Sequence, residues 1–174
     1  MRTNAMCIHD KINARARSRT DRRKNTSATA HIPGVLKALE GGQIPYRVIG
    51  AESEESAALT EWTERMFPFI HSQVDWSRIP SHQCVTWSGL EDLVLEFERF
   101  SRQLTPESLV MVMWADALCP VLEMNLAGVV RIAREIFEEH ETSTDVYVFS
   151  QHDRWLIEMH HEGSLCRGTL SAAP

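Results

Sequence analysis

The chain is divided near residue 30 into two parts of opposite charge. Residues 1–30 hold eight Lys or Arg against two acidic residues, whereas residues 31–174 hold ten against twenty-two. The first part has no aromatic residue and little apolar periodicity, so it cannot bury enough surface to offset the entropy of ordering. We therefore predict a flexible basic arm over residues 1–30 and one acidic folded domain over residues 31–174.

The apolar pattern of the second part predicts an α+β fold, with about three helices packed on one face of a mainly antiparallel sheet. Helices are expected over residues 31–42, 52–67, 90–104 and 126–137. Strands are expected over residues 44–49, 84–87, 109–114, 119–124, 146–149, 155–160 and 164–168. Two helix starts are predicted from side chains: a capping box of Ser88 with Glu91, and an N-cap at Asn125.

The sequence also narrows the class of protein. Its longest apolar run, 109–114, is too short to span a bilayer, and its first residues lack the apolar stretch of a secretory signal. The four cysteines form no C-x-x-C pair, which favours free buried thiols in a cytoplasmic protein. No glycine-rich phosphate loop, dinucleotide fingerprint or spaced metal-ligand set occurs, so we expect neither a cofactor nor a metal.

Glu158 and His160 are the best candidates for catalysis. They share one face of the strand predicted over residues 155–160, and His152 or Asp153 from the preceding turn could approach them. A carboxylate beside an imidazole can act as a general acid and base, which would suit a small hydrolase. The same residue types also describe an ordinary solvated sheet face. Both interpretations remain open at the level of sequence.

The acidic domain favours protein binding over nucleic-acid binding. A net charge of this sign repels nucleic acid and attracts basic protein surfaces, although it also suits a merely well-solvated surface. Trp76 lies in the loop predicted over residues 71–82 and could be an exposed anchor ringed by acids. The candidate residues for partner binding are Trp76, Asp116, Asp153, Glu158 and Glu162.

Two further questions stay open. The basic arm could contact an anionic partner, act as a targeting peptide or have no selected role. The protein could also be an oligomeric structural or regulatory protein, in which the strand over residues 164–168 pairs with a second copy.

The C-terminal hairpin carries a family resemblance. Residues 146–149 read Val-Tyr-Val-Phe, residues 155–158 read Trp-Leu-Ile-Glu, and residues 161–163 read His-Glu-Gly. Over residues 109–168 the chain resembles small bacterial cytosolic proteins that end in a similar aromatic hairpin, and its make-up is similar to that of toxin-immunity proteins. The resemblance implies a compact acidic protein that binds and blocks a basic toxin domain, often a nuclease. The basic arm departs from that pattern, since a positive tail would not help to dock a positive toxin.

Overall fold

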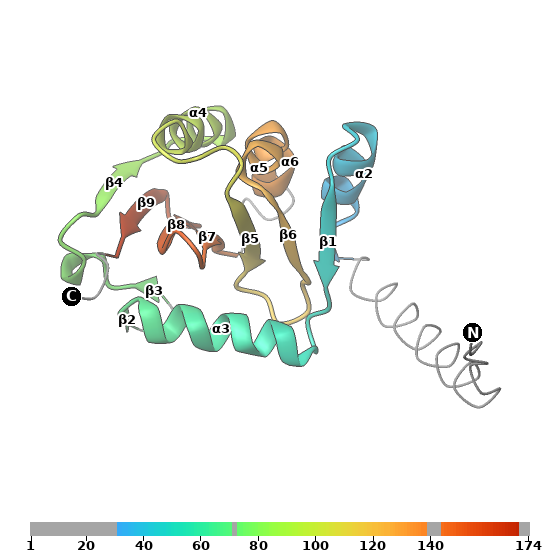
Figure 1. Ribbon diagram of the computed structural model, residues 1–174. Coiled ribbons are helices and arrows are strands. Elements are labelled where there is room, and N and C mark those ends of the chain that lie inside the picture. The colour runs from blue at the N-terminus through green and yellow to red at the C-terminus, as the bar shows by residue number, and fades with distance from the viewer. Residues whose placement is uncertain (1–30, 71–72, 139–143, 171–174) are drawn as a thin grey trace, which may run out of the picture.

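The computed structural model describes residues 31–70, 73–138 and 144–170. The predicted basic arm lies outside these residues. In the described part, seven strands form one sheet in the order β1-β6-β5-β7-β8-β9-β4, with all neighbours antiparallel (Figure 1). Their bounds are β1 Tyr46–Ile49, β4 Gln83–Thr86, β5 Leu109–Trp114, β6 Val121–Asn125, β7 Val146–Ser150, β8 Trp155–His160 and β9 Ser164–Thr169.

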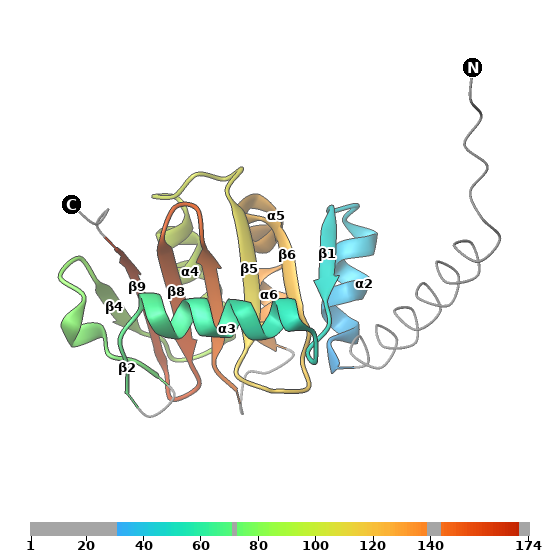
Figure 2. The same ribbon diagram turned by 60° about the horizontal axis from the view of Figure 1, so that its bottom comes forward.

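The two faces of the sheet are covered differently. Figure 1 shows several helices above the sheet and the helix α3 below it, and Figure 2 shows α3 crossing the strands. The upper helices are α2 Pro33–Gly41, α4 Leu90–Ser101, α5 Leu126–Arg131 and α6 Ala133–Glu138. The lower cover consists of α3 Glu54–Met66, a small hairpin of β2 Phe69–Ile70 and β3 Gln73–Val74, and the 3-10 turn η2 Trp76–Arg78. The predicted α+β class is confirmed, and α3 adds a second covered face.

Each face has its own apolar core. Between the sheet and the upper helices, Phe97 of α4 meets Phe137 of α6 edge to face, with ring centroids 5.2 Å apart. On the α3 face, Trp62 stacks on Phe149 of β7 at 5.5 Å. Because both faces are covered, every residue of β7 and β8 is buried.

Local signals explain several helix starts. The Ser53 hydroxyl accepts the Ser56 N–H at 3.1 Å, and Asn125 caps α5 by accepting the Gly128 N–H at 2.7 Å, as predicted. The predicted capping box is wrong in its partner: Ser88 bonds the Asp92 carboxylate through its N–H at 3.1 Å, while Glu91 pairs with Arg134. The helix expected over residues 126–137 is divided at Ile132 into α5 and α6.

The strand proposed for pairing with a second copy is not at an edge. β9 has β8 on one side and β4 on the other, and the edges of the described sheet are β1 and β4. Since the backbone groups of β9 are engaged on both sides, the sequence-based route to an oligomer through residues 164–168 is wrong.

The expectation of free thiols also needs correction. Cys84 of β4 and Cys166 of β9 face each other in register and form a disulfide. Antiparallel pairing brought together two cysteines that stand 82 residues apart, which no local spacing could reveal. Cys119 is buried and takes no part in this bond, and Cys7 lies outside the described residues.

No helix within the described ranges combines the length and the apolar character needed to cross a membrane.

Candidate functional site

The outer side of α3 carries a row of glutamates without counter-ions. Its inner side packs Leu59 and Thr63 against the sheet, so the glutamates at helical spacing point to solvent. Glu54, Glu61 and Glu64 are exposed, and no described residue forms an ion pair or hydrogen bond with their carboxylates. We call these three residues the α3 acidic row.

In contrast to the row, the neighbouring Glu55 has a counter-ion. Glu55 and Glu123 clamp the guanidinium of Arg47, with contacts of 2.6–2.8 Å. The hydrogen bonds from Arg47 lower the pKa of Glu123 and keep that carboxylate charged. Glu55 and Glu123 are therefore neutralised by Arg47, whereas the carboxylates of the α3 acidic row have no such partner among the described residues.

A cavity of about 370 Å³ opens beside this row. It lies between α3 and the loop joining β5 to β6, and its lining residues include the acids Glu64 and Asp116. Phe69, Met113 and Tyr147 supply apolar walls. We call this space the α3 cavity. An apolar slot with carboxylates suits a side chain that has an apolar stem and a cationic head.

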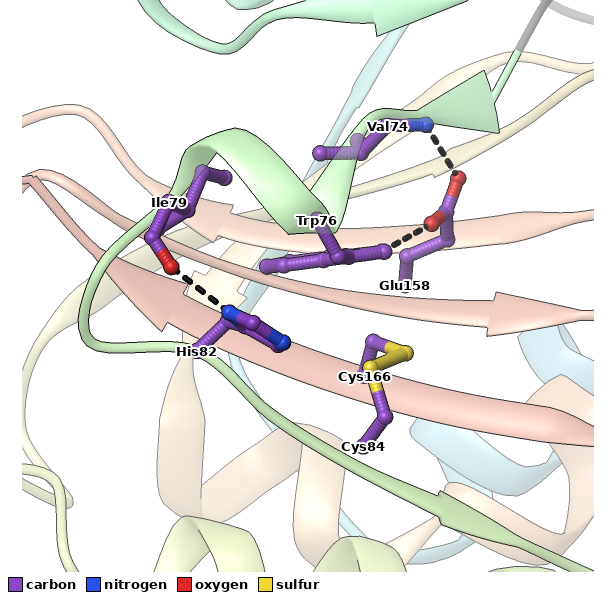
Figure 3. The surroundings of a disulfide bond; sticks show 7 residues. All are labelled: Val74, Trp76, Ile79, His82, Cys84, Glu158 and Cys166. Atoms are coloured by element: carbon purple, nitrogen blue, oxygen red, sulfur yellow. Dashed lines mark hydrogen bonds between the residues drawn. A yellow bond between two sulfur atoms is a disulfide. The ribbon is translucent and has the colours of Figure 1, made fainter.

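A second polar feature is buried beneath β3 and η2. Glu158 of β8 is 3% exposed; it accepts the Val74 N–H at 3.1 Å and the Trp76 indole N–H at 2.5 Å, as Figure 3 shows. The Tyr147 hydroxyl also bonds it from the neighbouring strand. Burial raises the pKa of Glu158 to about 7, and the nearby Asp145 carboxylate adds to the rise, while these hydrogen bonds oppose it.

The bonds of Glu158 favour a structural role. Its two oxygens hold the β2–β3 hairpin and Trp76 against the sheet, and neither cavity described in this protein is lined by it. A general acid or base needs access to the proton that it transfers. The geometry therefore favours Glu158 as a fastening for the cover rather than as a catalytic group.

His160 and His161 lie close together rather than on opposite sides of the strand. β8 ends at His160, so the chain turns and the two rings approach to 4.6 Å between centroids. Asp145 accepts from His161 through the backbone N–H at 3.0 Å and through Nδ1 at 2.8 Å. Nε2 of His160 lies 3.7 Å from the same carboxylate and contacts Gln73.

Among the residues that the structure describes, Asp145, His160 and His161 could hold a metal, since their ligand atoms lie within 4.8 Å of one another. Their present contacts, however, form a complete network. Nδ1 of His160 lies 3.3 Å from the Glu162 N–H and Nε2 contacts the side-chain amide of Gln73, so both ring nitrogens already have a polar neighbour. A metal would thus replace bonds that already satisfy these groups.

The predicted solvated face is wrong, since Glu158 and His160 are both buried. His152 and Asp153 do not approach them. They lie in the β7–β8 turn, where Ser150 pairs with Trp155, at the end of β8 opposite to His160. Asp153 instead accepts bonds from Ser108 at 2.5 Å and Ser150 at 3.2 Å.

The predicted partner-binding residues do not form one surface. Trp76 is half-buried against Glu158 rather than exposed. Asp116 and exposed Glu162 lie at one end of the sheet, while Asp153 lies at the other. Of this set, Asp116 alone lines the α3 cavity.

Sequence reasoning missed the α3 acidic row and Asp145. The row had a usable signal, because Glu54, Glu61 and Glu64 fall outside the apolar stripe of a predicted helix. The sequence does not reveal which face of the sheet this helix covers, so the position of its outer side in the molecule could not be predicted. Asp145 precedes a strand and had no signal of its own.

The chain was compared with known proteins. No protein-family description matches it, and no curated protein is significantly similar to it.

Proposed function

We propose that this protein is a protein-binding module that docks a basic partner on the α3 acidic row, and that the partner is a bacterial toxin domain which it neutralises. The observation that carries the proposal is the unpaired row on the outer side of the helix that covers one sheet face. Unneutralised charge of one sign steers a partner of the other sign and selects its orientation.

The α3 cavity supports the same proposal. Glu64 belongs both to the row and to the cavity lining, so the two features are continuous. A lysine or arginine of the partner could enter with its stem against Met113 and its charge near Glu64 and Asp116. Leu118, 59% exposed in the same loop, offers an apolar contact beside the charges.

The test is binding to a panel of basic proteins that includes nuclease toxin domains, with acidic proteins as negative controls. Biolayer interferometry at low and high NaCl should show binding to a toxin domain that weakens strongly with salt. Added protein should also inhibit the nuclease in a one-to-one ratio. Absence of binding, or affinity indifferent to salt, would contradict the proposal.

A charge-reversal pair locates the surface. E61R/E64R should lower the association rate by about tenfold or more, because steering accounts for factors of that size. The matched control is E40R/E138R, which changes the net charge equally on exposed positions of α2 and α6, across the sheet from α3. Equal losses in both variants would show a general charge effect without a docking surface.

A cytoplasmic location remains part of the proposal. The Cys84–Cys166 disulfide instead favours an oxidising compartment, since such bonds persist mainly there. Fractionation combined with immediate thiol alkylation decides between them: reduced thiols in the cytoplasmic fraction support the proposal, and oxidised protein in another compartment contradicts it.

A further inference from the structure

Three arginines of this acidic domain line one cavity and have no partner among the described residues. The cavity, about 460 Å³, lies where the end of α3, η2, the β7–β8 turn and the end of β9 meet. Arg65, Arg78 and Arg154 line it, and no acidic residue does. We call it the arginine cavity.

The other arginines of the described ranges are all engaged. Four pair with glutamates and two bond carbonyl oxygens or amide side chains: Arg47, Arg99, Arg102, Arg134, Arg131 and Arg167. No described residue forms a hydrogen bond or ion pair with the side chains of Arg65, Arg78 or Arg154. In a domain with a large excess of acids, three unpaired arginines at one place require an explanation.

Arg154 is the most constrained of the three. Its Nε is buried and has no hydrogen-bond partner among the described residues. Its backbone has φ of 56°, a conformation uncommon for residues other than glycine. That conformation is held by bonds of 2.9 Å from its own N–H to Ser150 and from the Leu170 N–H to its carbonyl oxygen. A buried donor left without an acceptor is costly, so the Arg154 side chain would gain free energy by turning its guanidinium toward an oxyanion in the cavity.

We propose that the arginine cavity binds a small organic phosphate. Guanidinium groups form paired hydrogen bonds with phosphate oxygens, and three of them match a ligand with more than one negative charge. The volume falls in the range of small-ligand sites and exceeds what a free phosphate ion needs. Met66, Ile79 and Leu170 offer apolar walls for the organic part.

The surroundings favour a small ligand over a nucleic acid. Glu61 lies one helical turn before Arg65 and Glu64 directly precedes it, and both glutamates are exposed. The positive region is therefore narrow and bordered by negative charge. A long polyanion would meet this repulsion along its length, whereas a ligand enclosed by the cavity would not. The site lies at the opposite end of α3 from its start near β1 and does not depend on the proposed function.

Binding can be followed through Trp76, because its ring and Ile79, a lining residue of the cavity, both lie against Gly168. The probes are inorganic phosphate, pyrophosphate, adenosine diphosphate and citrate, measured by tryptophan fluorescence and calorimetry on the full chain. We expect saturable binding of adenosine diphosphate or pyrophosphate below about 1 mM, and weaker binding of phosphate and citrate.

Variants identify the site. Arg65 and Arg78 are exposed, so R65Q and R78Q should fold normally by circular dichroism and weaken binding by about tenfold each. R78K should retain part of the affinity, because it keeps the charge but loses the planar fork. K37Q, the same charge change on α2, should bind like the wild type.

Four results would overturn the proposal. These are the absence of saturable binding for every probe, equal affinity in R65Q, R78Q and the wild type, citrate binding as tightly as the phosphates, and tighter binding of a single-stranded oligonucleotide through the same arginines. The last result would assign the cavity to nucleic acid.

Discussion

The two faces of the sheet are built on different principles. The face under α2, α4, α5 and α6 is closed by a continuous apolar core with Phe97 and Phe137 at its centre. The α3 face has a smaller core and more buried polar contacts, with Glu158 bonded to Trp76 (Figure 3) and Asp145 between two histidines. The disulfide joins the neighbouring strands β4 and β9 of the sheet. The first face is held mainly by apolar burial, while the second combines a smaller core with buried polar groups and bears the α3 acidic row and both cavities.

The largest expected effect compares the two cores directly. Phe97→Ala removes a fully buried ring and should lower the free energy of unfolding by about 3–5 kcal/mol. Trp62→Ala removes a half-buried ring from the α3 face and should cost less, while Leu95→Ala, at a side chain 62% exposed, should stay within about 0.5 kcal/mol. Urea unfolding measures all three, and equal costs for Phe97→Ala and Trp62→Ala would break the comparison.

Reduction of the disulfide between β4 and β9 should have the second-largest effect on the free energy of unfolding. Cys84 and Cys166 close a loop of 82 residues, so reduction should lower the free energy of unfolding by about 2–4 kcal/mol. Unfolding with and without reductant measures this effect. Cys84→Ser is the control, because reductant should no longer change its stability. If reductant left the free energy of unfolding of the wild type unchanged, the disulfide would not stabilise the fold.

Glu158 should make the α3 face sensitive to pH. Because burial raises its pKa from 4.5 to about 7, the folded protein keeps a proton that the unfolded chain has released in this range. Its contribution is full below pH 4.5 and is lost as pH rises to about 7, a change of up to about 3 kcal/mol.

To isolate the effect of this proton, the free energies of unfolding of the wild type and of Glu158→Gln are compared by urea unfolding at pH 5 and pH 8. Asp145 and His160 are present in both proteins, so the stability difference should shift against the wild type at the higher pH. Glu162→Gln, at an exposed position, should show no such shift. A constant difference for Glu158→Gln would mean that the pKa of Glu158 is not raised.

The smallest expected effect concerns the contact of Trp76 with β9. A Cβ at Gly168 would lie 2.8 Å from Cζ3 of Trp76 and 3.0 Å from Cγ2 of Ile79. Gly168→Ala should therefore cost about 1–3 kcal/mol and change the tryptophan fluorescence. Gly89→Ala meets nothing within 4 Å and is the matched control. Equal behaviour of the two variants would show that the cover is loose at this point.

The sequence alone determined the α+β class and most elements, because apolar periodicity is a local property. The strands over residues 109–114 and 155–160 have the predicted bounds, and Asn125 caps its helix as expected. The two faces of β8 were also readable from its alternation, with Ile157 in one core and Leu156 in the other.

Only the tertiary structure decided what covers each face and which distant residues meet. It placed α3 opposite the other helices, paired Cys84 with Cys166, buried Glu158 under Trp76 and gathered three unpaired arginines in one cavity. The physical reason is that sheet order and helix placement depend on the joint burial of segments far apart in the chain. A charge or a thiol has no identifiable neighbour until that packing exists.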